Sequence, residues 1–257
     1  MNQGIVIRNV NYAYKRTGNE FFPVLDDISL EVKEGDFVSV VGYSGCGKTT
    51  LLKIIGGLLR PVSGDVTINK YPPLVSLKRH RLGFIFQESS LLPWRNVFNN
   101  IKLAPEITGV NNNKEKLDSV VDLFGLKKYA NFYPSELSGG MKARVAIALA
   151  FAIEPCVLLM DEPFGHLDEI TRMSMNEILM DICFHKKTTA VFVTHNISEA
   201  VFLSDRVLVL SRLPASVKGI VRVDLPRPRK KDIRFSTVFS NKVKEVQDLL
   251  LSLNGKD

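Results

Sequence analysis

The amino-acid sequence predicts an α/β fold with a mainly parallel sheet, an additional antiparallel β layer and a helical insert. Three observations lead to this prediction. The run DFVSVVG at 36–42 is almost entirely apolar, as is typical of a strand buried on both faces of a parallel sheet. Segments with strand and helix character alternate towards the C-terminus. Strand character is missing from about residue 89 to 155, where the pattern is helical.

The length and composition favour one large domain with a sizeable core. The chain has 257 residues, of which 45% are hydrophobic and 24% charged, as in ordinary globular proteins. We expect a single domain over residues 1–257. Its parts are a core lobe at 1–88 and 156–225, a helical insert at about 89–155, and a C-terminal tail at 226–257.

The first part of the chain is expected to form the antiparallel layer and the first strands of the main sheet. IVIRNVNYAY and VLDDISLEVK partly alternate between polar and apolar residues, as antiparallel strands with one wet face do. KTTLLKIIGGLL has helical spacing, with one face formed by Leu51, Leu52, Ile55 and Leu58. The expected elements are strands at 5–14, 24–33 and 36–42, a helix at 48–59, and strands at 64–70 and 82–86.

The second part begins with amphipathic helices and returns to alternating strands and helices. A long helix after residue 166 is expected to present one apolar face, formed by Leu167, Ile170, Met173, Ile178 and Ile182. The expected elements are helices at 114–126 and 139–153, a strand at 156–163, a helix at 167–187, a strand at 188–195, a helix at 197–204, a strand at 206–211 and a last helix at 241–253.

Charge and cysteine content narrow the function classes. The net charge of +7 fits a nucleic acid, an anionic membrane surface or an anionic ligand as partner. Part of this charge lies in PRPRKK at 226–231, which we expect to be a solvated segment. The three cysteines are few and widely spaced, so they predict neither a disulfide framework nor a zinc site, and a reducing cytoplasm fits. The start of the sequence lacks the apolar core of a signal peptide, and no apolar stretch is long enough to span a bilayer.

The segment GYSGCGKT directly after the buried strand fits the phosphate-binding pattern G-x-x-x-x-G-K-[ST]. Glycines let backbone N–H groups turn towards phosphate oxygens, and the following helix N-terminus adds partial positive charge. Lys48 is expected to bridge the β- and γ-phosphates of ATP, and the Thr49 hydroxyl to ligate Mg²⁺. The fold class is therefore a P-loop NTPase core. The predicted ATP-binding residues of this segment are Gly42, Tyr43, Ser44, Gly45, Cys46, Gly47, Lys48, Thr49 and Thr50.

A phosphate loop needs a carboxylate on the metal side, and the strand in VLLMDEP ends in two acids. Asp161 is expected to hold Mg²⁺ through its water shell. Glu162 is placed to polarise a water molecule against the γ-phosphate. Two acids after a strand are a weak signal alone, but downstream of a phosphate loop they favour nucleotide hydrolysis.

The segment LSGGM at 137–141 completes an order of motifs that resembles the ATP-binding subunit of ABC transporters, over nearly the whole chain. The resemblance implies roles for residues outside the loop. Tyr14 takes the place of the aromatic residue that stacks on adenine, with Tyr12 as the competing choice. Gln87 matches the glutamine that reaches Mg²⁺ and senses the transport subunit. The remaining matches are the signature Ser138, Gly139 and Gly140, which caps ATP held by a second subunit, Asp168 of the dimer-contacting D-loop, and the switch histidine His195.

The same resemblance implies partners and a location. Two ATPase subunits, as a homodimer or a pair, sandwich two ATP molecules and dock on integral membrane permease subunits, which receive solute from a solute-binding protein. The chain is then expected at the cytoplasmic face of the membrane as a peripheral subunit. The sequence departs from the family pattern at Met141, where glutamine is usual, and at His166, where a small residue is commoner.

The segment FIFQESSLLPWRNVFNNI at 84–101 resembles importer subunits for nitrate, sulfonates and taurine. Trp94 and Leu92 are candidates for docking on the permease, and the alternative is that they pack the insert onto the core. Bicarbonate, cyanate or a pyrimidine precursor are other solutes that fit the resemblance.

Two other functions use the same loop. A small-molecule P-loop kinase needs no LSGGM segment, and the pair of Glu162 and His195 favours water as the acceptor. An ABC ATPase acting on nucleic acid fits the basic charge, but such proteins carry long coiled coils or two fused cassettes, which this sequence lacks. We therefore expect no nucleic-acid partner.

Overall fold

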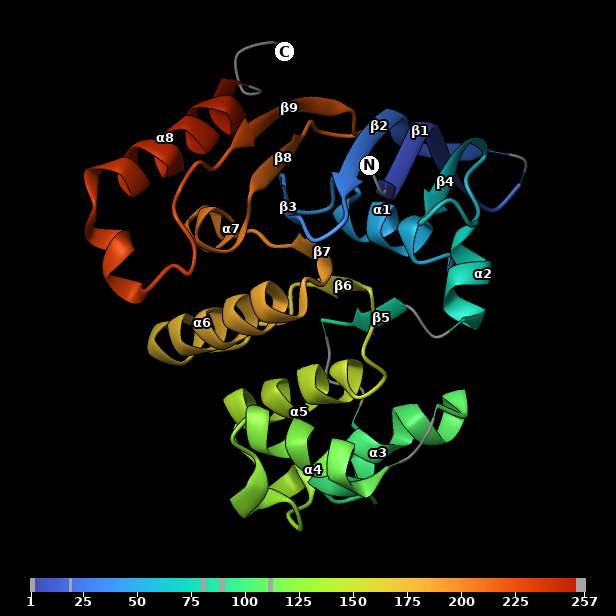
Figure 1. Ribbon diagram of the computed structural model, residues 1–257. Coiled ribbons are helices and arrows are strands. Elements are labelled where there is room, and N and C mark those ends of the chain that lie inside the picture. The colour runs from blue at the N-terminus through green and yellow to red at the C-terminus, as the bar shows by residue number, and fades with distance from the viewer. Residues whose placement is uncertain (1–2, 19, 80–81, 88–90, 111–112, 253–257) are drawn as a thin grey trace.

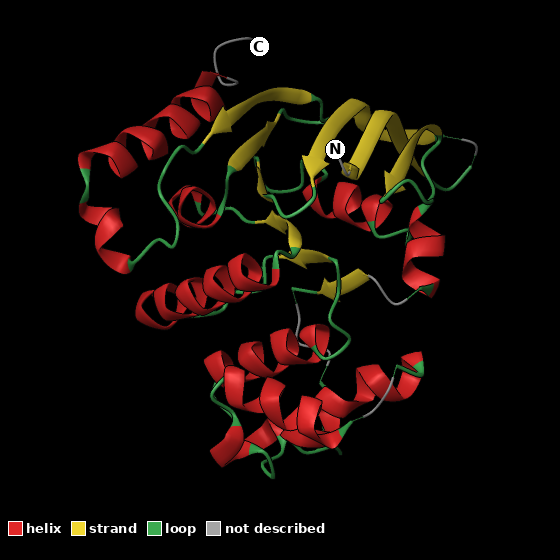
Figure 2. Cartoon of the chain, viewed as in Figure 1, coloured by secondary structure: helices red, strands yellow, loops and turns green. Residues whose placement is uncertain are grey.

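The computed structural model describes residues 3–18, 20–79, 82–87, 91–110 and 113–252. Within these residues the strands form two sheets (Figures 1 and 2). A three-stranded antiparallel sheet has the order β2-β1-β4, and a six-stranded sheet has the order β5-β6-β7-β3-β8-β9. The strands are β1 (Gln3–Lys15), β2 (Phe21–Lys33), β3 (Phe37–Val41), β4 (Ser63–Ile68), β5 (Leu82–Ile85), β6 (Val157–Asp161), β7 (Thr189–Val193), β8 (Arg206–Leu210) and β9 (Val217–Arg222).

Helices cover the six-stranded sheet and form a separate cluster below it in Figure 1. The α-helices are α1 (Lys48–Ile55), α2 (Pro73–Lys78), α3 (Val97–Thr108), α4 (Lys114–Leu123), α5 (Gly139–Phe151), α6 (Glu169–Lys186), α7 (Ile197–Leu203) and α8 (Thr237–Leu251). The 3₁₀ helices are η1 (Lys127–Tyr129), η2 (Pro134–Glu136) and η3 (Lys231–Phe235). The α/β fold with a mainly parallel sheet and an antiparallel layer is confirmed.

The centre of the six-stranded sheet consists of the runs that the sequence predicted to be buried. Every residue of β3, β6 and β7 is buried, because helices cover one face of these strands, and α1 with the antiparallel sheet covers the other. The three strands run parallel, with β7 between β6 and β3. The carboxyl ends of parallel strands meet at one edge of a sheet. The phosphate-loop segment, the acids that follow β6 and the histidine that follows β7 therefore lie at the same edge.

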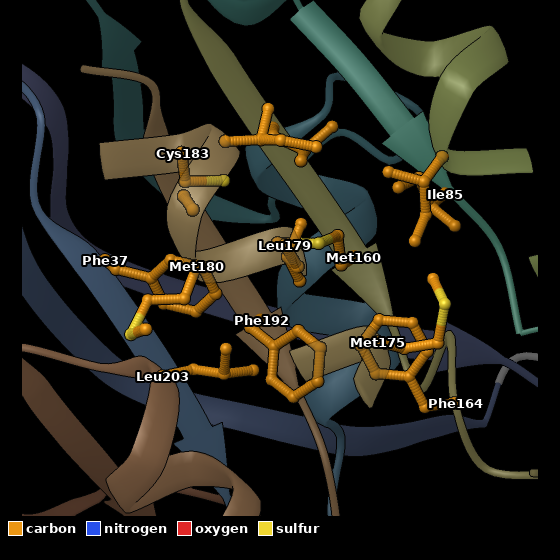
Figure 3. Packing of buried hydrophobic residues seen from close by; sticks show 14 of the residues in the cluster. Phe37, Ile85, Met160, Phe164, Met175, Leu179, Met180, Cys183, Phe192 and Leu203 are labelled. Carbon is orange, nitrogen blue, oxygen red and sulfur yellow. The ribbon is translucent and has the colours of Figure 1, made fainter. Parts of the chain in front are cut away.

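The main apolar core lies between the sheet and α6. In Figure 3, Met175 and Leu179 of α6 lie beside Met160 of β6 and Phe192 of β7. All four side chains are fully buried. This packing fixes the directions of β6 and β7, and so it fixes where their carboxyl ends lie.

The helices α3, α4 and α5 pack on one another in the lower part of Figure 1. Phe124 and Phe151 meet there with ring centroids 5.8 Å apart. The predicted boundary between the core lobe and the insert, at residues 88 and 89, lies outside the described residues. The alternative that Trp94 packs the insert onto the core is wrong, because 71% of this residue is exposed.

Two expectations about local structure are wrong, and two elements were not expected. Leu58 is exposed, because α1 ends at Ile55 and the chain turns at Gly57, which has a φ of 73°. Ile170 is 82% exposed, because the buried face of α6 begins at Met175. The pattern analysis also missed the short helix α2 and the strand β9, which pairs antiparallel with β8.

The expectation that PRPRKK at 226–231 is solvated is wrong for its central arginine. Arg229 is only 2% exposed, and its guanidinium donates to backbone carbonyls at the end of α7. Arg227 in the same segment forms an ion pair with Asp205, with 2.9 Å between Nε and Oδ1. The backbone carbonyls that end a helix accept hydrogen bonds readily, so they draw these arginines inwards.

Candidate nucleotide-binding and hydrolysis site

The phosphate-loop segment connects β3 to α1 in a conformation that requires glycine at two positions. Gly47 has a φ of 107°, and a Cβ atom there would lie 2.9 Å from Val24. A Cβ atom on Gly42 would lie 2.7 Å from the Cys46 sulfur. Cys46 itself is buried, and burial raises the pKa of its thiol, so this side chain fills space below the loop.

The Lys48 ammonium lies under this loop and points into it. Its Nζ donates to the backbone carbonyls of Gly42 and Tyr43, both at 3.0 Å. The residue is 6% exposed. The helix α1 starts directly at Lys48 without a side-chain cap, and its first turn carries no acidic residue. A buried cation beside uncapped N–H groups is an arrangement suited to an anion such as a phosphate.

A hydrogen bond connects the phosphate loop to the end of β6. The Thr49 hydroxyl donates to Asp161 Oδ1 at 3.0 Å. Burial raises the pKa of Asp161, and the charge of Glu162 adds to this, while the bond from Thr49 opposes it. A hydroxyl and a carboxylate are hard oxygen ligands, so this pair fits Mg²⁺. No cluster of three or more histidine, cysteine or acidic side chains in the described part of the chain forms an all-protein metal cage.

Glu162 and His195 face each other across the ends of β6 and β7. His195 Nδ1 lies 3.1 Å from Glu162 Oε2. The backbone of Glu162 has a φ of 44°, an uncommon value for a residue other than glycine, and its N–H donates to the Val193 carbonyl at 3.0 Å. Strained backbone of this kind is concentrated at functional sites. The arrangement holds a carboxylate and an imidazole at the mouth of the loop.

The two tyrosines that compete for the adenine role occupy different environments. Tyr14 is exposed and its hydroxyl lies 3.2 Å from Thr50 Oγ1, beside the start of α1. Tyr12 is partly buried and packs against the core that includes β1 and β2. The two rings meet edge to face at 5.0 Å. Tyr14 is thus the one whose ring is accessible to a base.

Gln87 lies at the end of β5, exposed, in a hollow of about 210 Å³. Gly139 and the segment after β6, including Pro163 and His166, line the same hollow. Among the described residues Gln87 forms no hydrogen bond with Thr49 or Asp161. Its predicted role at the metal remains a prediction.

The signature segment begins α5. Ser138 caps α5, with its Oγ accepting from the Met141 N–H at 3.3 Å. A Cβ atom on Gly140 would lie 2.6 Å from Thr171 Cγ2, so glycine is needed where α5 and α6 meet. The side chain of Met141 packs against the apolar core, which explains how this position does without glutamine's polar contacts.

Asp168 has a local structural task at the start of α6. Its Oδ1 accepts from the Thr171 N–H at 3.0 Å, and hydrogen bonds from the backbone and side chain of Thr171 lower the pKa of its carboxyl group. His166, two residues earlier, is exposed. Both residues are accessible for contact with another molecule.

The pattern analysis missed a buried pair beside His195. Glu199 is 4% exposed and accepts from the Thr194 hydroxyl at 2.6 Å. Asn196 caps α7, and the spacing from Asn196 to Glu199 is that of a helix start with an acid three residues later. The spacing indicates the helix start, but the burial of the carboxylate follows only from tertiary packing.

The structure thus brings Lys48, Thr49 and Asp161 together, and it places Glu162 against His195. None of the helices in the described ranges is both long and apolar enough to cross a membrane. In the signature, Ser138 and Gly139 are exposed to solvent.

Comparison with known proteins agrees with this arrangement. The chain is 43% identical over 232 residues to the nitrate import ATP-binding protein NrtC of Synechococcus elongatus, covering 88% of this chain but only 35% of that relative. It is 43% identical over 222 residues to the aliphatic sulfonates import ATP-binding protein SsuB of Bacillus cereus, covering 86% of each.

A solved structure resembles the fold along most of its length. It is a dimeric ATP-binding cassette in a post-hydrolysis state with ADP and Pi, with a TM-score of 0.76 and 30% identity. The alignment covers 86% of this chain and all of the other. The sequence pattern of the ABC transporter family matches residues 25–165. The chain therefore belongs to the ABC transporter family.

Proposed function

We propose that this chain is the ATP-binding and ATP-hydrolysing subunit of an ABC importer for a small anion such as nitrate, a sulfonate or taurine. The observation that carries the proposal is the meeting of three sequence motifs at one sheet edge. The loop cation Lys48, the bonded pair of Thr49 and Asp161, and the contact of Glu162 with His195 lie there together. An anionic nucleotide and a water molecule are the reactants that this set suits.

ATP binding rests on the loop and the helix behind it. On ATP binding, the Lys48 ammonium exchanges its hydrogen bonds to the Gly42 and Tyr43 carbonyls for bonds to β- and γ-phosphate oxygens. These oxygens are negatively charged, so they compensate the charge of the ammonium better. The backbone N–H groups from Gly45 to Thr50 donate to the phosphates. Tyr14, exposed next to Thr50, stacks on the adenine.

The side chains at the start of α1 and the end of β6 would suit Mg²⁺. When bound, it neutralises the charge that develops on the phosphate oxygens during transfer. The Thr49 hydroxyl and the Asp161 carboxylate would hold it, Asp161 through water. Gln87 is proposed as a further oxygen ligand after a movement of the segment that follows β5.

Hydrolysis depends on a water molecule activated by Glu162. The carboxylate accepts a proton as the water oxygen attacks the γ-phosphorus, so that ADP and inorganic phosphate leave. His195 Nδ1, 3.1 Å from the carboxylate, orients Glu162 and donates towards the γ-phosphate once it turns. Both side chains retain access to solvent, which admits the attacking water.

A second ATPase subunit is proposed to complete each site. The signature residues Ser138, Gly139 and Gly140 begin a helix, and the start of a helix attracts anions. The solved cassette with a similar fold is a dimer. Head-to-tail pairing of two chains would bring the signature of one to the γ-phosphate held by the other, with Asp168 near the junction.

Docking on membrane permease subunits is proposed at the helical insert. Trp94 exposes 71% of its surface on the loop before α3, and Phe86 next to Gln87 is also exposed. Buried Asn100 fixes that loop by donating to the carbonyls of Leu92 and Arg95 at 3.1 and 2.7 Å. A rigid loop with an exposed tryptophan is a suitable anchor for a partner helix. The chain would then be peripheral at the cytoplasmic face.

Reconstitution in vesicles tests the proposal. The chain, its permease subunits and the solute-binding protein are combined, and ATP hydrolysis is measured with nitrate, taurine or a neutral sugar. Stimulation by one of the anions is expected, and Lys48→Ala abolishes hydrolysis while the exposed control Lys128→Ala retains it. Stimulation by DNA or RNA instead would support the nucleic-acid alternative, and phosphate transfer to a small molecule would support the kinase. The similar importer subunits do not favour either alternative.

A further inference from the structure

The C-terminal segment 226–235 crosses α7, the helix that follows His195. Arg229 Nη1 donates to the carbonyls of Val201, Phe202 and Ser204 at 2.8–3.0 Å. Arg227 donates to the Leu203 carbonyl at 2.6 Å. The segment therefore fixes the C-terminal end of α7 relative to the sheet.

Arg234, further along the segment, contacts α7 near both of its ends. Its guanidinium lies over the Phe202 ring at 4.1 Å, and its Nη1 donates to Ser198 Oγ at 3.3 Å. With the Asn176 amide in the orientation that satisfies both of its neighbours, Arg234 Nη2 donates to the side-chain oxygen of Asn176 at 3.2 Å. Arg234 therefore ties α7 to α6.

Asn176 links Arg234 to the buried carboxylate of Glu199. One orientation of its amide satisfies both neighbours, with the oxygen facing Arg234 and the nitrogen donating to Glu199 Oε1 at 3.0 Å. In the reverse orientation the amide nitrogen faces the guanidinium, and the amide oxygen faces the carboxylate. Arg234 thus selects the orientation that Glu199 needs. Asn176 is 1% exposed, so water does not replace either contact.

Glu199 in turn fixes the backbone on both sides of His195. Its Oε2 accepts from Thr194 Oγ1 at 2.6 Å, and Thr194 Oγ1 accepts from the Asn196 N–H at 3.0 Å. Asn196 Oδ1 accepts from the Glu199 N–H at 3.0 Å. His195 lies between Thr194 and Asn196, so this closed set of bonds sets the direction of its side chain towards Glu162.

We propose that Arg234 is a positioning residue for His195, acting through Asn176, Glu199 and Thr194. The C-terminal segment then belongs to the machinery of the hydrolysis site, although every catalytic motif precedes residue 200. The expected effect of Arg234 on the rate of hydrolysis rests on the proposed ATPase function. Its expected effect on the position of the His195 ring does not, and it can be measured without ATP.

The structural test is NMR of the imidazole groups in the full chain. The chain has four histidines, so the His195 signals are assigned by their loss in His195→Ala. Arg234→Met removes the donors while keeping the length of the side chain, and it is expected to shift the His195 ring signals. The matched control is Lys231→Met on the same segment, whose side chain is exposed and which is expected to leave them unchanged. Unchanged His195 signals in folded Arg234→Met overturn the proposal, whether or not the protein hydrolyses ATP.

The kinetic test separates positioning from general stability. Arg234→Met is expected to lower kcat for ATP about tenfold with little change in KM, since small misplacements of a catalytic group cost rate steeply. In a His195→Ala background the same change is expected to have no further effect. An equal fall in both backgrounds would overturn the proposal and assign Arg234 a stabilising role only. Absence of turnover in the wild type would refute the proposed function and leave the NMR result as the test of this inference.

Discussion

Replacing Arg229 by methionine tests the most unexpected feature of the fold. The guanidinium donates to five backbone carbonyls, three through Nη1 and two through Nη2 at 3.3 Å each. Burial lowers the pKa of Arg229 to about 10, so the group remains charged at neutral pH. Methionine retains the apolar stem and removes every donor.

The magnitude follows from the carbonyls that lose their partner. Three of them end α7, lie within 3.0 Å of Nη1 and are buried with the arginine. A net loss of about 1 kcal/mol for each of these three bonds gives a destabilisation of about 3 kcal/mol. The two longer bonds are left out of this sum, because their loss is offset by no longer burying a charge. For a chain of this size each kcal/mol corresponds to about 2–4 °C in Tm, so Tm is expected to fall by about 6–12 °C.

Urea and thermal unfolding, followed by circular dichroism, measure this change. The matched control is Lys230→Met, the exposed neighbour in the same segment, which is expected to shift Tm by less than about 2 °C. A Tm for Arg229→Met that equals that of the control would refute the reasoning. The buried hydrogen bonds would then only offset the cost of burying the arginine's charge and add nothing to the free energy of unfolding.

Three further predictions follow from the site and its surroundings. Lys48→Ala is expected to lower ATP turnover at least about a hundredfold with an unchanged circular dichroism spectrum, and wild-type turnover would contradict its role. Trp94→Ala is expected to weaken co-purification with permease subunits while basal ATP hydrolysis and Tm remain unchanged, because its side chain is exposed, and equal co-purification would contradict the docking role. Gly140→Ala is expected to destabilise the fold by about 1–3 kcal/mol in urea unfolding, because the new methyl group overlaps Thr171. Gly139→Ala, whose Cβ atom would meet nothing closer than 3.8 Å, serves as its control, and equal stability of the two variants would refute the overlap.

Continuous apolar runs predicted the centre of the fold correctly. The strands β3, β6 and β7 are buried on both faces, so their sequences carry an uninterrupted signal. The phosphate-loop segment carries an equally strong signal, because its backbone tolerates only glycine at Gly42 and Gly47. These features depend on local sequence, so they could be predicted without knowledge of tertiary contacts.

The features that pattern analysis missed depend on tertiary contacts. The strand β9 is a half-exposed edge strand with a glycine at its centre, so it lacks a regular alternation. Ile170 and Leu58 have the spacing of a buried helix face, but no neighbouring part of the fold covers them, so they are exposed. In PRPRKK, composition does not distinguish the arginine that meets the end of α7 from its solvated neighbours.

The residue types of the candidate site could be predicted from the sequence, but the hydrogen bonds that link them to the rest of the fold could be predicted less well. The sequence placed Asp161, Glu162 and His195 at the ends of strands, and the parallel order of these strands brings them to one edge. The buried link from Arg234 to Glu199 could not be predicted, since it joins segments without a shared periodicity.

The most direct test of the central claim is the mass of Glu162→Gln in solution with ATP, with ADP and without nucleotide. Glutamine keeps the size of the side chain but removes the base, so ATP is expected to remain uncleaved between two chains. Light scattering after size-exclusion chromatography should then show a dimer with ATP only, and Ser138→Arg in the same chain should restore the monomer. If the purified chain alone gives monomers throughout, the same comparison is made in the detergent-solubilised complex with its permease. ATP turnover at the wild-type rate, or assembly that is the same with ATP and ADP in both settings, would contradict hydrolysis at a site shared between two subunits.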